Sequence, residues 1–273
     1  MLYDMHTHTH FSHDSAQDPE GNCLAAIEKG LSGIAFTDHA DMWYYNKRNT
    51  LEHIVSSVDA AAALGEKYKG KLKVLRGIEV GDAYFDPSVT AELIARINPD
   101  VVIGSIHCLS YKGLSDAYSQ MNLSESAISR DGLVGMMNRY LELVTDIAEN
   151  HDIDILAHLS CPLRYMNGKY RRGISETEFE EQIKRILNAV IRRNIALEIN
   201  TSGLVNGEGD TLPSETVLAW YKELGGTLLT LGSDAHSAEK VANGFDQTVT
   251  VLKKLGFTEC VYYENRKAVP YTI

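Results

Sequence analysis

The sequence lacks the features that mark secreted and membrane-spanning proteins. Its four cysteines are widely scattered among 273 residues and form no CxxC pair, which argues against a disulfide framework or a zinc ribbon and for reduced thiols. No apolar run approaches the roughly 20 residues that cross a bilayer. The first residues also lack the basic and apolar segments of a signal peptide. We therefore expect a cytoplasmic protein that has no membrane partner.

Basic residues are also in short supply. Lysine and arginine number 26 against 37 aspartates and glutamates, for a formal net charge of −11 and a pI of about 5.4. This balance argues against long nucleic acids and anionic membranes as partners. A small anionic substrate is still compatible, because bound metal ions can reverse the sign of the field inside a pocket.

The apolar pattern predicts an α/β protein. Short β-branched runs alternate with longer segments of helical period, which is typical of repeated βα units around a parallel sheet. The expected strands are 2–8, 33–39, 73–80, 101–107, 154–159, 196–201 and 227–236. The expected helices are 22–29, 51–68, 91–97, 133–149, 176–193, 215–224 and 244–255.

Seven such strands in a chain of this length favour a single domain, 1–273, built as a closed or nearly closed TIM-like barrel. A doubly wound open sheet is the alternative. Segments 108–131 and 200–209 are expected to be long loops above the barrel. Long loops in compact α/β domains are often functional.

Residues whose side chains can bind metal stand at the C-terminal ends of six of the seven predicted strands. A parallel strand buried on both faces should read as continuous apolar sequence, and here the pattern is broken at the C-terminal residues. These residues are His6, His8, Asp38, His39, Glu79, His107, His158, Asp234 and His236. Because barrel active sites lie at the C-terminal ends of the strands, we expect these side chains to meet at one mouth.

The spacing within two of these strands supports a metal site. His6 and His8 are two residues apart, as are Asp234 and His236, so each pair lies on one face of its strand. Imidazole and carboxylate together suit zinc, manganese or iron better than calcium or magnesium. The ligands are too many for one tetrahedral ion, which predicts a cluster of two or three ions with Glu79 as a bridge.

Each of these residues also has a simpler interpretation. A lone histidine at a strand end is more often hydrogen-bonded in the core than bound to metal. Asp38 can cap a turn or orient His39 rather than bind an ion. The joint pattern over six strands is what predicts the metal site.

The ordered motifs resemble those of the polymerase and histidinol phosphatase (PHP) superfamily. The matching segments are 4–9, Ser12, Asp14, 37–39, Glu79, His107, His158 and 232–236. The resemblance implies a distorted seven-stranded (β/α)7 barrel with three divalent metal ions. By motif position it implies three ligand sets: His6, His8, Glu79 and Asp234; Glu79, His107 and His158; and Asp14, His39 and His236. Some relatives have histidine in place of Asp14, which leaves the neighbouring His13 as an alternative ligand.

The chain length, segments 158–160 and 197–203, and Arg164 resemble the histidinol-phosphate phosphatase branch. This implies hydrolysis of L-histidinol phosphate to L-histidinol and phosphate, in histidine biosynthesis. Arg164 is the candidate for holding the substrate phosphate, because guanidinium matches phosphate oxygens. Val205 stands where that branch often has a basic residue.

The expected chemistry is attack on phosphorus by a metal-bridging hydroxide. A general acid for the leaving alcohol is needed, and Asp234 and His39 are candidates. Another small phosphate ester or a nucleotide is the alternative substrate. An amidohydrolase-type barrel fits less well, since it commonly has a carboxylated lysine where His107 stands. A non-catalytic metal-binding domain would have lost ligands, whereas all nine positions are filled.

Overall fold

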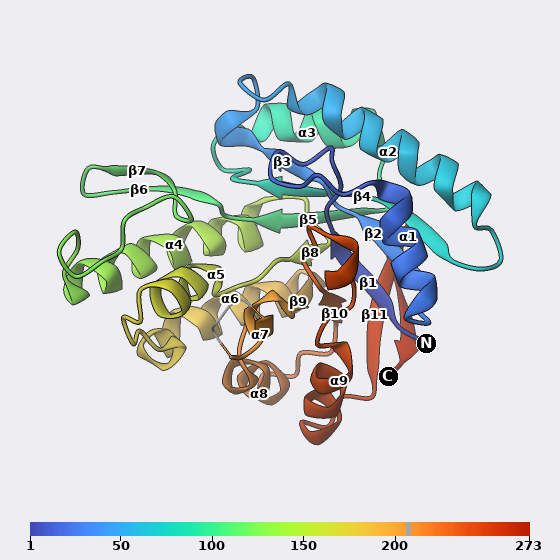
Figure 1. Ribbon diagram of the computed structural model, residues 1–273. Helices are drawn as coiled ribbons and strands as arrows, with labels where there is room; N and C mark the ends of the chain where they lie inside the picture. The colour runs from blue at the N-terminus through green and yellow to red at the C-terminus, as the bar shows by residue number, and fades with distance from the viewer. Residues whose placement is uncertain (206–208) are drawn as a thin grey trace.

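Parallel strands form the centre of the molecule, and helices surround them (Figure 1). The structure is a computed structural model that describes residues 1–205 and 209–273. In sheet order the strands are β1 (Tyr3–Thr7), β2 (Gly33–Phe36), β4 (Lys73–Gly81), β5 (Val101–Ser105), β8 (Ile155–Leu156), β9 (Ala196–Asn200) and β10 (Leu229–Gly232). These correspond to the seven predicted strands.

The first and last of these strands, β1 and β10, meet and close the sheet. The backbone N–H of His8 donates to the carbonyl of Ala235 at 2.9 Å, and that of Asp234 donates to the carbonyl of His6 at 2.9 Å. The buried carboxylate of Asp4 reinforces the seam by accepting the backbone N–H of Ser233 at 2.9 Å. The barrel prediction is therefore confirmed over the open-sheet alternative.

Across residues 1–205 and 209–273, seven longer helices lie outside the strands, near the predicted positions. They are α1 (Pro19–Glu28), α2 (Thr50–Lys67), α3 (Pro87–Ile97), α4 (Arg130–Asn150), α6 (Glu180–Arg192), α8 (Glu215–Glu223) and α9 (Phe245–Lys254). Their N-termini follow local chemistry: Asp18 caps α1 by accepting the N–H of Gly21, with Pro19 in the first turn. In the described residues, no helix is both long and apolar enough to span a bilayer.

The expectation of a long loop over 108–131 was wrong for its first part. Strands β6 (Cys108–Tyr111) and β7 (Leu114–Ala117) pair as an antiparallel hairpin that projects from the barrel in Figure 1. Lys112 and Gly113 form its turn with φ of 46° and 86°, the left-handed backbone that two-residue hairpin turns require. A lysine at that position gives little sequence signal, so the hairpin was missed.

The second predicted strand, 33–39, is split. After β2 the chain leaves the sheet, and β3 (His39–Asp41) pairs with β4 instead. The predicted loop 200–209 includes a short helix, α7 (Ser202–Val205), and its residues 206–208 lie outside the described residues. Short helical turns also follow β8, namely α5 (Cys161–Leu163) and a π-helix at Arg164–Lys169.

A C-terminal hairpin, β11 (Glu259–Glu264) with β12 (Lys267–Thr272), packs at the N-terminal ends of the barrel strands. The ring of Tyr262 stacks on Tyr3 at the start of β1, with centroids 4.1 Å apart. The hydroxyl of Tyr263 donates to the carbonyl of Asp154, just before β8, at 2.9 Å. The sequence did not predict this hairpin. It covers the end of the barrel opposite the candidate site.

Candidate metal centre

Glu79 lies at the centre of the residues predicted to bind metal. Its side chain is fully buried at the C-terminal part of β4. Its Oε1 lies 3.0 Å from His158 Nε2 and 3.2 Å from His107 Nε2. Its Oε2 lies 2.7 Å from His39 Nδ1 and 3.4 Å from His6 Nε2. His8 Nε2 lies 3.6 Å from the same Oε2, so five histidines face this one carboxylate.

A second group of ligand atoms comes from the seam between β1 and β10. His6 Nε2 and His8 Nε2 lie 3.0 Å apart. Asp234 Oδ1 lies 3.3 Å from His8 Nε2 and 4.0 Å from His6 Nε2. These three residues form one of the groups whose ligand atoms are close enough to share an ion.

The third predicted group contains the choice between Asp14 and His13. Asp14 Oδ2 lies 3.3 Å from His236 Nε2 and 3.5 Å from His39 Nε2. His13 instead places Nδ1 3.0 Å from Arg48 Nη1. Asp14 rather than His13 therefore faces the two histidines of this group, and His13 lies beside it in the wall of the pocket.

The residues present fit a metal cluster. Among the described residues, Glu79 Oε2 and His39 Nδ1 are buried without a hydrogen bond of good geometry, although they lie 2.7 Å apart as an ion pair. Buried polar atoms are rarely left in this state in a folded protein, and a cation among them supplies the missing partner. The donors are imidazole nitrogens and carboxylate oxygens, the set that suits zinc, manganese or iron.

The electrostatics of the cluster keep its carboxylates ionised. Burial opposes ionisation of Glu79, but the surrounding His107, His6 and His39 hold the pKa of this carboxyl well below its ordinary value. Burial lowers the pKa of His8 to about 3, with His39 and His236 adding to the effect. Although burial opposes it, neighbouring carboxylates raise the pKa of His6, His39 and His107 well above its ordinary value. These imidazoles therefore release a proton when they bind a metal ion.

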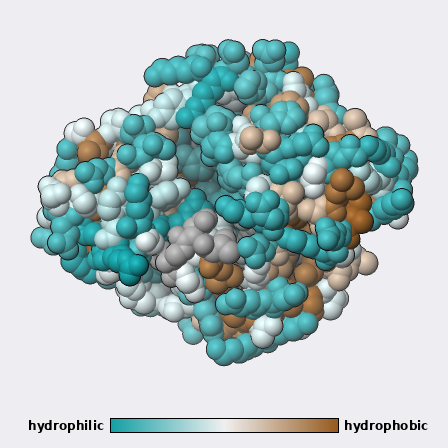
Figure 2. Space-filling model, viewed as in Figure 1, coloured by the Kyte–Doolittle hydropathy of each residue, from teal (hydrophilic) through white to brown (hydrophobic). Residues whose placement is uncertain are grey.

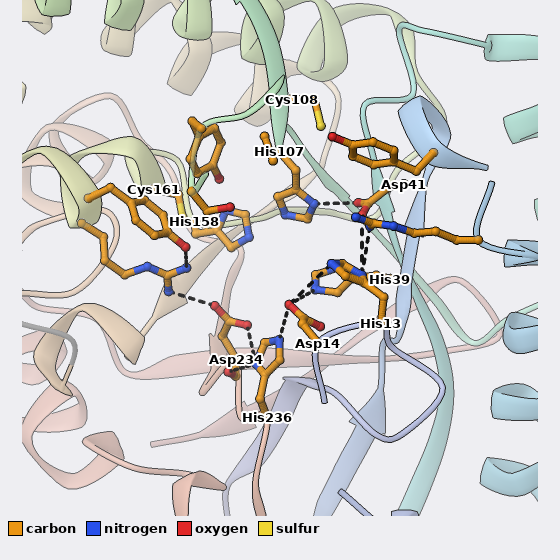
Figure 3. A pocket seen from close by; sticks show the side chains of 17 residues that line it. His13, Asp14, His39, Asp41, His107, Cys108, His158, Cys161, Asp234 and His236 are labelled. Carbon is orange, nitrogen blue, oxygen red and sulfur yellow. Dashed lines mark hydrogen bonds and ion pairs between the residues drawn. The ribbon is translucent and has the colours of Figure 1, made fainter. Parts of the chain in front are cut away.

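A hollow opens above these groups (Figure 3). Figure 2 shows the molecular surface hollowed near the centre of this view, with hydrophilic side chains around the hollow. Arg164 lines one wall: its Nη1 donates to Ser202 Oγ at 2.6 Å and to Asp234 Oδ2 at 3.2 Å. Arg164 belongs to the π-helix, an irregular element frequent at functional sites.

Asp38 plays a different part from the one considered for it. Its Oδ1 accepts the N–H of Thr9 at 2.7 Å and the hydroxyl of Ser12 at 2.6 Å. Ser12 Oγ in turn lies 3.0 Å from His8 Nδ1. Asp38 therefore fastens the loop after β1 and supports His8 through Ser12, rather than contacting the ring of His39.

Sequence reasoning missed three residues of the site. Asp41 and Arg48 line the pocket, and Glu198 lies beneath it, 2.5 Å from His6 Nδ1. Glu198 interrupts the apolar strand β9, and a buried ionisable residue there is costly unless it is paired, which is a signal that could have identified it. Asp41 follows His39 by two residues on the same strand face. Arg48 has no comparable signal.

Comparison with known proteins identifies the family. A family model described as the PHP domain matches residues 4–202, which is more than half of the chain. The chain belongs to the PHP domain family. This confirms the resemblance drawn from the motifs, and the fold agrees with it.

Several relatives are similar to the chain over nearly its whole length. The chain is 29% identical to a histidinol-phosphatase from Lactococcus lactis subsp. lactis over 267 residues, which covers 97% of this chain and 95% of that one. It is 30% identical to a protein named probable histidinol-phosphatase from Clostridium acetobutylicum, covering 97% and 98%. The crystal structure of the Lactococcus histidinol phosphate phosphatase, complexed with Zn, L-histidinol and phosphate, matches with a TM-score of 0.76 at 25% identity over 98% of each chain.

A further solved structure, from Listeria monocytogenes, shares the fold with a TM-score of 0.78 at 21% identity, over 90% of this chain and 99% of that chain. Together with the ligand geometry, the comparisons confirm the predicted class of enzyme, a metal-dependent hydrolase of the phosphatase type.

Proposed function

We propose that this chain hydrolyses a small phosphate monoester, L-histidinol phosphate, to L-histidinol and phosphate. The observation that carries the proposal is one pocket in which Arg164 faces the cluster of predicted ligands. The Lactococcus and Clostridium relatives bear this activity in their names, and the Lactococcus structure holds Zn, L-histidinol and phosphate.

The nine predicted residues hold three divalent ions, zinc, manganese or iron, in this proposal. By the family resemblance, the ligand sets are His6, His8, Glu79 and Asp234; Glu79, His107 and His158; and Asp14, His39 and His236. The pairs His6–Glu79, His107–Glu79 and His236–Asp14 lie 3.4, 3.2 and 3.3 Å apart. Such ions supply an activated water as nucleophile and polarise the phosphate oxygens. Glu79 is the residue shared between two sets; its Oε1 faces two histidine nitrogens and its Oε2 faces three.

Arg164 orients the phosphate in this proposal. Ser202 and Asp234 hold Nη1, and the hydroxyl of Tyr165 accepts from Nη2 at 3.1 Å. A guanidinium held in this way is pre-organised for phosphate oxygens. Asp234 and His39 line the same pocket. Although burial opposes it, His8, His6 and His236 hold the pKa of Asp234 well below its ordinary value, so His39 is the better of the two candidates for protonating the leaving alcohol.

Another small phosphate ester is the second candidate, and Arg48 favours it. Arg48 lines the same pocket, and its Nη1 donates to Asp41 Oδ2 at 2.8 Å. Its guanidinium also lies over the ring of Tyr44, 4.1 Å from the centroid. A cation beside an aromatic ring suits a substrate with a second anionic group, such as a nucleotide.

A substrate panel separates the two candidates. The metal-loaded protein is assayed for phosphate release from L-histidinol phosphate, mononucleotides and sugar phosphates, and kcat/KM is compared. We expect L-histidinol phosphate to exceed the others by at least tenfold. A nucleotide at the top of the ranking replaces the substrate assignment, and no turnover of any ester by a fully metal-loaded protein rejects the phosphatase proposal.

A further inference from the structure

Two of the predicted ligands, His6 and His107, differ from the others in what holds their outer ring nitrogen. His6 Nδ1 lies 2.5 Å from Glu198 Oε1, and His107 Nδ1 lies 2.8 Å from Asp41 Oδ1 (the second pair is drawn in Figure 3). Neither carboxylate is itself a predicted ligand. In both histidines the opposite nitrogen, Nε2, faces Glu79. The two rings therefore bridge from an outer carboxylate to the central one.

Each of these pairs meets directly above a glycine. A Cβ added at Gly232 would lie 2.2 Å from Glu198 Oε1 and 2.8 Å from His6 Cβ. A Cβ added at Gly81 would lie 2.2 Å from Asp41 Oδ1 and 2.8 Å from His107 Nδ1. Real Cβ contacts are essentially never this short. Any other residue at either position would occupy the place of the carboxylate.

The two arrangements follow the same order across the barrel. Asp41 lies on β3, Gly81 on the next strand, β4, and His107 just after the following strand, β5. Glu198 lies on β9, Gly232 on β10, and His6 on β1, which closes the barrel beside β10. In each case a carboxylate extends over a glycine of the intervening strand and contacts a histidine two strands away.

We propose that Glu198 and Asp41 are positioning residues for His6 and His107. Glycine at 232 and 81 leaves the space that these carboxylates occupy, because a larger residue would overlap them. The inference rests on the proposed metal centre. Each carboxylate accepts the Nδ1 proton, which fixes the tautomer and leaves the Nε2 lone pair directed at the cluster.

The carboxylates are themselves held in place. Glu198 Oε2 accepts the N–H of His158 at 2.7 Å and Nδ2 of Asn200 at 3.1 Å. Glu198 therefore supports two predicted ligands, the ring of His6 and the backbone of His158. Asp41 Oδ2 accepts from Arg48, which leaves Oδ1 for the single bond to His107. A carboxylate whose one oxygen is fixed by hydrogen bonds can orient the imidazole ring that binds its other oxygen.

The test measures metal affinity in the absence of substrate. Glu198→Gln and Asp41→Asn keep the size of each side chain but remove its charge. We expect each to weaken zinc binding by about 10–100-fold in competition with a chelator of known affinity, the usual effect of losing a partner of this kind. Asp154→Asn is the matched control. This buried carboxylate pairs with Arg266 and accepts the N–H of Val102, far along the strands from the predicted ligands.

Nuclear magnetic resonance of zinc-loaded protein labelled with ¹⁵N-histidine gives a second readout. We expect wild-type His6 and His107 to be protonated at Nδ1. Of these two rings, Glu198→Gln should alter the signal of His6 but not that of His107, and Asp41→Asn should do the reverse. Zinc affinity within twofold of wild type in both variants overturns the proposal, as does an equal loss in Asp154→Asn. Loss of turnover with unchanged affinity and unchanged ring signals overturns it as well.

Substitution of the glycines is an independent test of the proposal. Gly81→Ala should weaken zinc binding. Gly104→Ala, on the neighbouring strand β5, should not, because the nearest atoms to its Cβ would belong to the side chains of Ile153 and Ile147. Combined with Asp41→Ala, Gly81→Ala should cause less than the sum of the two separate losses, since Asp41 Oδ1 is gone and only the 2.8 Å approach to His107 Nδ1 is left. Additive losses overturn the role assigned to Gly81. A wild-type protein that binds metal but hydrolyses no ester contradicts the proposed function and leaves this inference standing.

Discussion

The Nε2 atoms of His6 and His8 lie 3.0 Å apart, and each lies within 3.6 Å of Glu79 Oε2. Two imidazoles whose ring nitrogens converge on one carboxylate oxygen are arranged to share a cation. Their separation by two residues on one strand puts both rings on the same face.

Replacing both histidines should therefore abolish the site. We expect His6→Ala/His8→Ala to lose most bound metal and to reduce turnover of a phosphate monoester by roughly 10³-fold or more, the size of several kcal/mol in the barrier. Elemental analysis and initial rates measure the two effects. His10→Ala, an exposed histidine on the same segment, is the control. Full metal content together with full activity in the double variant would contradict the mechanism.

Metal removal should destabilise the fold. The ions bind the folded state, so they add RT ln(1 + [L]/Kd) to its stability, about 4 kcal/mol at a thousandfold excess over Kd. For a chain of this size we expect chelation to lower Tm by about 10 °C, and added zinc or manganese to restore it. Differential scanning calorimetry measures the shift. The His6→Ala/His8→Ala variant should show a much smaller one, and an equal shift in that variant would speak against the site.

Substitution of Asp14 should reduce the bound metal, and substitution of His13 should not. Asp14 Oδ2 faces both His39 and His236, so Asp14→Ala should lose about one bound ion and at least about tenfold in turnover. His13→Ala should keep the full metal content, because its ring contacts Arg48 instead. Elemental analysis of both variants decides the assignment. Metal loss in His13→Ala with none in Asp14→Ala would reverse it.

Arg164 should act on the phosphate rather than on the metals. Arg164→Ala should retain bound metal and lower kcat/KM by about 10²–10³-fold, typical for removing one donor to a transition state. Steady-state kinetics and elemental analysis measure the two quantities. Arg171→Ala is the matched control, since Arg171 is exposed in the same segment and should behave like wild type. An unchanged kcat/KM in Arg164→Ala would remove it from the proposed site.

The four thiols should be unreactive in the native protein. All four cysteines are buried and free, and burial raises the pKa of both Cys23 and Cys260 to about 12. A raised pKa leaves the neutral thiol as the dominant form, so at pH 8 only about 10⁻⁴ of such a group is thiolate, the reactive form. Titration with a thiol reagent should find four groups after denaturation and none rapidly before it. A fast native thiol would contradict this burial.

The repeating βα pattern and the ligands at strand ends were readable from the sequence. Parallel strands buried on both faces must be apolar, so His107 and His158 stand out at the ends of apolar runs. The two hairpins were not readable. The turn of β6–β7 contains Lys112, and that of β11–β12 contains Asn265 and Arg266 with φ of 51° and 61°. Packing around these turns, rather than a strong sequence signal, determines their left-handed backbone conformation.

The sequence by itself determined the βα order, the family and the identity of the predicted ligands, because these depend on periodicity and on residue type. Only the tertiary structure decided which side chains support them. Glu198 and His6 are 192 residues apart, and they meet because closure of the barrel places β9, β10 and β1 side by side. No local pattern encodes that adjacency. It arises from the way the whole sheet curves around its core.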